Sequence, residues 1–257
     1  MPSLGGWLRT VREHRNLTRP QVEADAHISA AHLKLVETGS TIPRQSTLDK
    51  IVTVYGMSGV QQRHTTELYQ PSLPLPPVDE LRQRVLHGHR AELSAFESRS
   101  LACGFCDPLW NVLASNQTFD VLYPGLGNAE NNLALLHLHT MADDPATPSP
   151  ADADTVFLVA SLRGAFGRFR DEPRATRLLH RLCEDHRFRT LWTTSVAVAY
   201  ERGPHRLRSP GLDATVTAQV TELRDEPGVL SIVAYRRPHT TPARAPGLDS
   251  PAPDRTG

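Results

Sequence analysis

The sequence has almost no lysine: of its 28 basic residues only Lys34 and Lys50 are lysines, and the rest are arginines. It also has no net charge, since 28 acidic residues balance the basic ones. This excludes a protein that is basic over its whole surface but leaves room for a local basic face. No uninterrupted apolar run reaches about 18 residues, so no membrane-spanning helix and no membrane partner are expected.

Cysteine is also scarce. Cys103, Cys106 and Cys183 are the only three, and an odd number cannot pair completely within one chain. The first residues, MPSLGGWLRTVREHR, lack the apolar stretch and small-residue cleavage site of a secretory signal. These features predict a soluble, cytoplasmic protein.

Proline marks the expected domain organisation. A chain of 257 residues predicts one or two domains. The segment 71–77, PSLPLPP, is so rich in proline that we expect a semi-rigid linker between a domain at 1–70 and a second at 78–238. The last segment, 239–257, is again rich in proline and poor in large apolar residues, which predicts a disordered tail.

The first domain is predicted to be all-α, with five short helices. Apolar residues recur at helical spacing, and residues typical of helix caps stand between them. The stripe of the first helix is Leu4, Leu8 and Val11. Thr18 and Gln21 fit a capping box at the start of the second helix, and Ser29 fits the N-cap of the third, which ends at Gly39. The fourth helix contains Leu48, Ile51 and Val52 and ends at Gly56. The fifth helix covers roughly 59–69.

The second domain mixes strand and helix patterns. Two apolar runs, 101–106 and 110–114, are separated by the turn signal Asp107-Pro108 and predict a hairpin. Helices are expected at 116–123, 131–141, 154–170, 173–186 and 187–194, and strands at 196–200, 214–223 and 229–235. Strands, then helices, then strands predict an α+β fold with a mainly antiparallel sheet.

The segments LRTVREHRNLT (8–18) and HISAAHLKLVETGSTIPRQSTLDKIVTVYGMS (27–58) resemble the helix-turn-helix of XRE-type (lambda-repressor-like) regulators, and the match covers about residues 4–57. The resemblance implies binding to double-stranded DNA and an ion pair between Arg12 and Glu37. Two positions depart from the family. Glu23 replaces a small residue, and His27 replaces the glycine of the turn, although histidine tolerates left-handed backbone geometry better than most residues.

The resemblance also implies which residues meet DNA. Its base-facing positions match Ser29, Ala30, Ala31 and Leu35, none of which can form the bidentate hydrogen bonds that distinguish guanine or adenine. We therefore expect positioning contacts to dominate, with DNA shape and the spacing of a homodimer adding specificity. The flanking and phosphate-holding candidates are His32, Lys34, Arg19, Gln21, Thr41 and Arg44. The alternative is that an exposed Leu35 binds a protein, as in an antitoxin or anti-regulator.

Five segments in order resemble the MmyB-type domain that follows such helix-turn-helices and has a PAS-like fold. They are CDPLWNVLASN (106–116), NNLALL (131–136), VASLRGAF (159–166), LLHRLCEDHRFRTLW (178–192) and VLSIVAYRRP (229–238). The resemblance implies a regulatory domain for a small, apolar ligand, with fatty acids as the suggested class. Ser115 replaces a tryptophan of the family, and Ser209-Pro210 replaces its His-Pro.

A ligand site in this domain can be sketched from its large residues. Trp110, Phe119, Phe157 and Trp192 could line a cavity, or they could be plain core. Arg163 lies in an apolar helical segment, and a buried arginine calls for an anionic partner. Our hypothesis is that Arg163 pairs with a ligand carboxylate, with Asn116 nearby; the alternative is an internal acid or solvent.

The sequence predicts no metal, no cofactor and no enzyme. Cys103 and Cys106 form a CxxC that, with His137 and His139, could suggest zinc or redox chemistry. Residues three apart on a strand point to opposite faces, and residues two apart on a helix lie about 200° apart, so neither pair converges. The prediction is a homodimeric transcription regulator that reads an imperfect palindrome.

Overall fold

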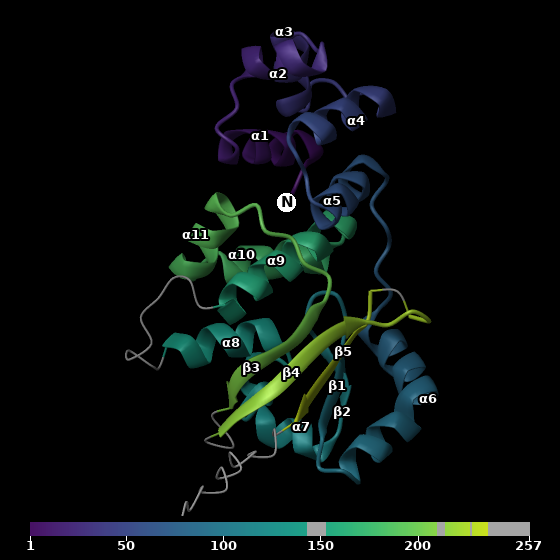
Figure 1. Cartoon of the computed structure of the whole chain (residues 1–257). Coiled ribbons are helices and arrows are strands. Elements are labelled where there is room, and N and C mark those ends of the chain that lie inside the picture. Colours follow the sequence, from purple (N-terminus) through teal and green to yellow (C-terminus); the bar gives the residue numbers. More distant parts are fainter. Residues whose placement is uncertain (143–152, 210–213, 227, 236–257) are drawn as a thin grey trace, which may run out of the picture.

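The N-terminal part of the chain is a bundle of five helices, as predicted. The computed structural model describes residues 1–142, 153–209, 214–226 and 228–235 (Figure 1). The helices are α1 (Leu4–His14), α2 (Arg19–Ala26), α3 (Ala30–Glu37), α4 (Gln45–Val54) and α5 (Gly59–Tyr69). The tail predicted for 239–257 lies outside the described residues.

The helix ends follow the local signals of the sequence. Thr18 and Gln21 form the reciprocal capping box of α2, and the Ser29 hydroxyl accepts the His32 N–H at 3.2 Å as the N-cap of α3. His27 takes the left-handed geometry that the turn requires, with φ 54° and ψ 42°. The predicted turn between α2 and α3 is therefore confirmed.

The C-terminal part is an α+β unit, which confirms the predicted fold class. Its elements are α6 (Val78–Glu97), β1 (Ala102–Cys106), β2 (Val112–Ser115), α7 (Gln117–Leu122), the short 3-10 helix η1 (Leu126–Ala129), α8 (Leu133–Ala142), α9 (Ala153–Arg168), α10 (Pro173–Leu182), α11 (His186–Thr194), β3 (Arg202–Ser209), β4 (Ala214–Glu222) and β5 (Leu230–Tyr235). The five strands are ordered β2-β1-β5-β4-β3, and all neighbours run antiparallel. Helix α9 is buried on most sides, as expected of a helix with apolar residues all round.

The strand predicted at 196–200 is wrong. This segment pairs with no strand, and its Val196 and Val198 are buried in the core of the five-helix bundle instead. The carbonyl of Val196 accepts the Gln61 side-chain N–H of α5 at 3.0 Å. Apolar residues alternate here because an extended chain buries every second side chain. The side chains of this segment are buried against helix α5 and not in a sheet.

Three elements, the short η1, strand β3 and helix α6, have no counterpart among the predictions. Strand β3 contains Pro204 and several charged residues, and it is an edge strand whose register shifts between Arg202 and His205. Proline is tolerated at edges and bulges, so it hides such strands from pattern reading. Helix α6 buries Leu81, Val85 and Leu93 and packs on β1 and β2, which the proline segment before it obscures in the sequence.

The two parts of the chain touch directly, through α5 and α9 (Figure 1). His64 of α5 is completely buried, and a Cβ added to Gly167 of α9 would lie 2.4 Å from its ring. The proline segment runs along the second part: the Leu73 N–H donates to the Arg168 carbonyl at 2.9 Å, and Arg174 donates to the carbonyl of Leu75 at 2.9 Å. The segment therefore does not hold the two parts away from each other.

His64 should make the fold sensitive to acid. Burial first, and then repulsion by Arg163, lower the pKa of His64 from 6.5 to about 3. The unfolded chain takes up this proton below about pH 6.5 while the folded chain does not, so stability falls as the pH falls through that window. We expect a loss of about 1.4 kcal/mol in the free energy of unfolding between about pH 7.5 and about pH 5.5.

Urea unfolding at the two pH values measures this loss. The variant His64→Leu should flatten the dependence, because it removes the group that gains a proton on unfolding. The matched control is His87→Leu, since His87 is exposed and should leave the dependence intact. An equal pH dependence in His64→Leu and the native chain would contradict the assignment. The pKa of Asp107, which burial raises, acts with the opposite sign in both chains and cancels in the comparison.

Candidate DNA-binding surface and ligand-binding domain

The outer face of α3 carries short and apolar side chains. Ser29, Ala31, Lys34 and Leu35 are exposed, and Leu35 is 46% exposed although it is a large apolar residue. Ala30 and His32 are half-buried, while Leu33 and Val36 hold the other face of the helix in the bundle core. The short side chains leave the helix backbone open to close approach by another molecule.

A buried ion pair fixes where α3 ends. Arg12 of α1 donates through Nε and Nη2 to the two carboxylate oxygens of Glu37, at 2.6 and 3.1 Å. The Glu37 side chain has no exposed surface, and it also accepts Arg19 at 2.8 Å. The hydrogen bond to Glu37 raises the pKa of Arg12 against the opposing effect of burial. The pair implied by the resemblance therefore joins α1, the start of α2 and α3.

The predicted phosphate contacts differ in how free they are. Arg19 is half-buried, and its guanidinium is already bound to Glu37. Gln21 uses its side-chain oxygen in the capping box, which leaves its amide nitrogen for another acceptor. Thr41 is half-buried, whereas Lys34 and Arg44 are exposed and meet no acid at ion-pair distance in the described ranges. Lys34 and Arg44 are therefore the best-placed cations.

Glu23, which replaces a small residue of the family, has a structural role at the start of α3. Its side-chain oxygen accepts the backbone N–H of Ala30 at 3.0 Å, so it closes the turn and caps the first turn of α3. The N-terminal end of a helix favours anions, and phosphate groups bind there in many proteins. Glu23 thus places a carboxylate at a position where a DNA phosphate would otherwise bind favourably.

In the second part of the chain, Trp110 has a strained backbone. Its φ is +67°, a left-handed value that large side chains rarely adopt. The buried carboxylate of Asp107 holds this turn by accepting the N–H groups of Leu109 and Asn111, each at 2.9 Å. Strain of this kind persists where surrounding contacts over-determine it, and it is often found at functional sites.

The Trp110 side chain reaches the central helix α9. Its indole N–H donates to the Ser161 hydroxyl at 3.2 Å, and its ring meets that of Phe157 edge-on with centroids 5.9 Å apart. Two of the predicted ligand-site aromatics are therefore neighbours. Trp110 is the predicted residue whose geometry most favours a role beyond packing.

Asn116 and Phe119 form a second group, on α7. The Asn116 side chain accepts the N–H groups of Cys103 and Phe119 at 3.0 and 2.9 Å, and it donates to the Leu101 carbonyl. Phe119 is completely buried, with its ring against Gly104. These contacts give Asn116 the role of a helix cap and Phe119 the role of core.

Arg163 and Trp192 form the third group. The guanidinium of Arg163 is 4.5 Å from the centre of the Trp192 ring and donates to the carbonyls of Ala197 and Trp192, at 3.1 and 2.9 Å. Burial lowers the pKa of Arg163 to about 10, which leaves it charged at neutral pH. The requirement for an acidic partner is therefore wrong, because backbone carbonyls and a ring face satisfy this arginine. Its pairing with a ligand carboxylate stays a prediction.

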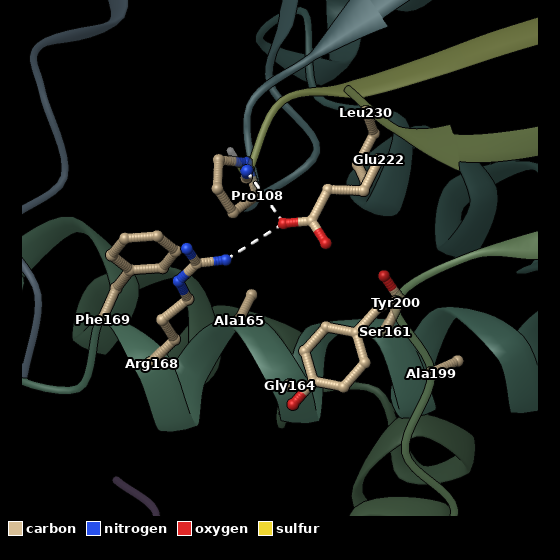
Figure 2. Close-up of a pocket in the computed structure, with 11 residues that line it drawn as sticks. Pro108, Ser161, Gly164, Ala165, Arg168, Phe169, Ala199, Tyr200, Glu222 and Leu230 are labelled. Carbon is tan, nitrogen blue, oxygen red and sulfur yellow. Dashed lines mark hydrogen bonds and ion pairs between the residues drawn. The ribbon is translucent and has the colours of Figure 1, made fainter. Parts of the chain in front are cut away.

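A small pocket lies between α9, the segment 196–200 and the ends of β4 and β5. Its volume is about 30 Å³, which is room for one or two waters. Figure 2 shows Arg168 and Glu222 pointing toward each other in this pocket, with the Tyr200 ring close to Gly164. Ser161, the partner of Trp110, is also part of its wall. None of the six predicted ligand residues lines it.

The CxxC lies inside the sheet. Cys103 and Cys106 are both completely buried in β1, and burial raises the pKa of the Cys103 thiol to about 12. His137 contacts the Thr155 hydroxyl at 2.9 Å. Within the described ranges, no three His, Cys, Asp or Glu side chains come together as a metal site would need. The same ranges contain no helix with both the length and the apolar character of a membrane span.

Family models match both parts of the chain. A helix-turn-helix domain matches residues 3–65, and the MmyB-like transcription regulator ligand binding domain matches residues 99–246, more than half of the chain. The chain belongs to the MmyB-like transcription regulators. It is a DNA-binding regulator with a ligand-binding domain and not an enzyme. No curated protein matches the chain.

The two family matches assign the helix-turn-helix surface and the Trp110 region to different domains of the regulator. Helices α2 and α3, with their confirmed turn, belong to the helix-turn-helix match. The ligand-binding match begins at residue 99, after α6, so it contains the whole sheet and the strained turn at Trp110. Sequence reasoning missed the capping role of Glu23, which it noted only as a departure from the family, and the pocket residues Glu222 and Tyr200, which belong to no motif.

Proposed function

We propose that the regulator binds operator DNA as a homodimer, with α3 in the major groove and the exposed cations Lys34 and Arg44 on the phosphates. The carrying observation is that the exposed start of α3 has small side chains, Ser29 and Ala31, so its backbone can approach the groove floor, while Lys34 and Arg44 are exposed cations on and after this helix. Base readout through these residues is limited to apolar contacts such as thymine methyl groups. Phosphate contacts, DNA shape and half-site spacing then supply most of the selectivity.

The first experiment is selection of genomic DNA fragments by the purified regulator at two salt concentrations. An enriched palindrome that persists at the higher salt supports a specific homodimer, and the half-site spacing gives its geometry. Diffuse capture that disappears with salt would show that α3 does not read bases. In that case the favoured alternative is a protein partner, because Leu35 and Ile42 are 46% and 78% exposed.

Charge changes beside α3 should act in opposite directions on DNA affinity. Arg44→Gln should weaken binding about equally on all sequences and reduce the slope of log affinity against log salt by about 1. Glu23→Gln should tighten binding about two- to five-fold, because it removes an anion from the N-terminal end of α3. Fluorescence anisotropy across a salt series measures both effects.

The control for this pair is Asp49→Asn on α4, an exposed acid whose side chain accepts Gln45 at 2.8 Å. It changes the net charge as Glu23→Gln does, but Asp49 lies on α4 and its side chain binds Gln45 of the same helix. Equal tightening by the two variants would mean that net charge alone acts, and would remove Glu23 from the interface.

We further propose that the second domain senses a small apolar molecule, with fatty acids as the first class to test. What supports this is the cluster of Trp110 and Phe157 beside a strained turn, in an aromatic-rich interior. The described pocket is too small for such a ligand, so binding requires side chains to move, and Trp110 is a large side chain on a left-handed, strained backbone. Titration with a saturated fatty acid, followed by tryptophan fluorescence, tests the proposal; no change at any chain length would count against it.

A further inference from the structure

Helix α5 makes polar contacts to the ligand-binding domain in addition to the packing of His64 against Gly167. The Arg63 guanidinium lies 3.5 Å above the centre of the Tyr200 ring and donates to Glu222 at 2.9 Å. The Tyr200 hydroxyl in turn donates to Glu67 at 2.5 Å. These four residues, Arg63, Glu67, Tyr200 and Glu222, are called the junction below. Two of them come from the DNA-binding part and two from the ligand-binding part.

Glu222 is the shared point of the junction. Its carboxylate accepts Arg63 of α5, Arg168 of α9 at 3.0 Å, and the backbone N–H of Gly228 at 2.9 Å. Burial alone would raise the pKa of Glu222, but the two arginines outweigh it and lower the pKa. One ionised side chain at the end of β4 thus ties a helix of the first part to the sheet and to the central helix of the second.

The junction also forms part of the pocket wall. Tyr200 and Glu222 line the pocket together with Arg168, so a change in the pocket acts on the groups that hold α5 (Figure 2). Ser161, which binds the Trp110 indole, lines the same pocket. A chain of contacts therefore runs from the strained turn at Trp110, through the pocket, to α5.

The proline segment is attached to the ligand-binding part. Its carbonyls at Leu75 and Pro76 accept Arg174 at 2.9 and 2.8 Å, which attaches this stretch to the ligand-binding part. Arg170 also donates to the carbonyls of Glu67, at 3.0 Å, and Gln70, so the last turn of α5 is attached to the ligand-binding part in the same way.

We propose that the junction is the coupling device between the two domains. While Glu222 holds Arg63 and Arg168 together, the helix-turn-helix moves with the ligand-binding domain as one body. When a change at the pocket draws Glu222 away, α5 loses its ties to the sheet and to Arg168 but keeps the bond of Gln61 to Val196, so the second domain sets the position of α3 less firmly. The effect of the junction on DNA binding rests on the proposed function. The contact between α5 and the ligand-binding domain does not, because it is present without ligand or DNA.

Hydrogen exchange on the full chain, without ligand or DNA, tests the proposal. Glu222→Gln should speed exchange of the α5 amides about ten-fold while the amides of β1 and α8 keep their native rates. The matched control is Glu226→Gln, which makes the same chemical change at a residue that pairs with Arg84 of α6, at 3.5 Å. It should leave α5 unchanged.

A milder variant guards against simple unfolding. Tyr200→Phe keeps the ring under Arg63 but loses the bond to Glu67, so it should speed α5 exchange about three-fold. Native α5 rates in both variants would overturn the proposal, and so would a uniform rise in all elements, because that would make Glu222 a general stabiliser. DNA affinity measured on the same samples would show separately whether the proposed function holds.

Discussion

Arg12→Met is expected to lower the free energy of unfolding by about 3 kcal/mol, because it leaves the buried carboxylate of Glu37 without its main partner. Glu37 has no exposed side-chain surface, and Arg12 is its closest cation at 2.6 Å. The loss should fall at the lower end of the range for broken buried pairs, since Arg19 still lies 2.8 Å away. Urea unfolding followed by helix content measures it. DNA affinity should fall as well, because Glu37 is the last residue of α3.

A double variant separates the ion pair from the loss of packing. Arg12→Met combined with Glu37→Met removes both buried charges and should be more stable than Arg12→Met alone. Arg9→Met, which breaks the exposed pair of Arg9 and Glu13 on the same helix, should cost about 0.5 kcal/mol or less. Losses of similar size in Arg9→Met and Arg12→Met would show that burial of the pair does not matter.

Phe119→Ala is expected to cost about 3–5 kcal/mol, the range for removing a completely buried aromatic ring. The ring has no exposed surface and fills the space above Gly104, where an added Cβ would lie 2.5 Å from it. The same α7 carries Val121, which is 46% exposed, so Val121→Ala is the matched control and should change stability by about 0.5 kcal/mol or less. A loss below about 1 kcal/mol for Phe119→Ala would favour the original hypothesis of a cavity wall over core.

The contact can be tested from its other side. Gly104→Ala overfills the same space and should cost about 1–3 kcal/mol. Adding Phe119→Leu to it should restore part of that loss, because the smaller side chain gives room for the new methyl group. No recovery in the double variant would mean that the strand backbone, and not the ring, limits residue 104.

Local signals in the sequence predicted the first domain well. The capping box at Thr18, the N-cap at Ser29 and the left-handed turn at His27 depend on residues only a few positions apart, so they can be read without the fold. The second domain was harder. Val196 and Val198 alternate as a strand would, and only the fold shows that they cover α5.

The candidate sites divide in the same way. Lys34 and Arg44 could be named from the family resemblance, and they are exposed. Arg163 could be expected to be buried, but its partners are carbonyls at Ala197 and Trp192, far along the chain. Side-chain composition predicts that a buried cation needs acceptors; it does not predict which ones.

The sequence by itself determined that this protein has a helix-turn-helix followed by an α+β domain, because periodicity, caps and family motifs act over short stretches. The tertiary structure decided that α5 docks on α9 and that Glu222 joins Arg63 to Arg168. Glu222 and Arg63 are 159 positions apart. No local pattern can specify such a contact, because it exists only when the sheet and the bundle have folded and met.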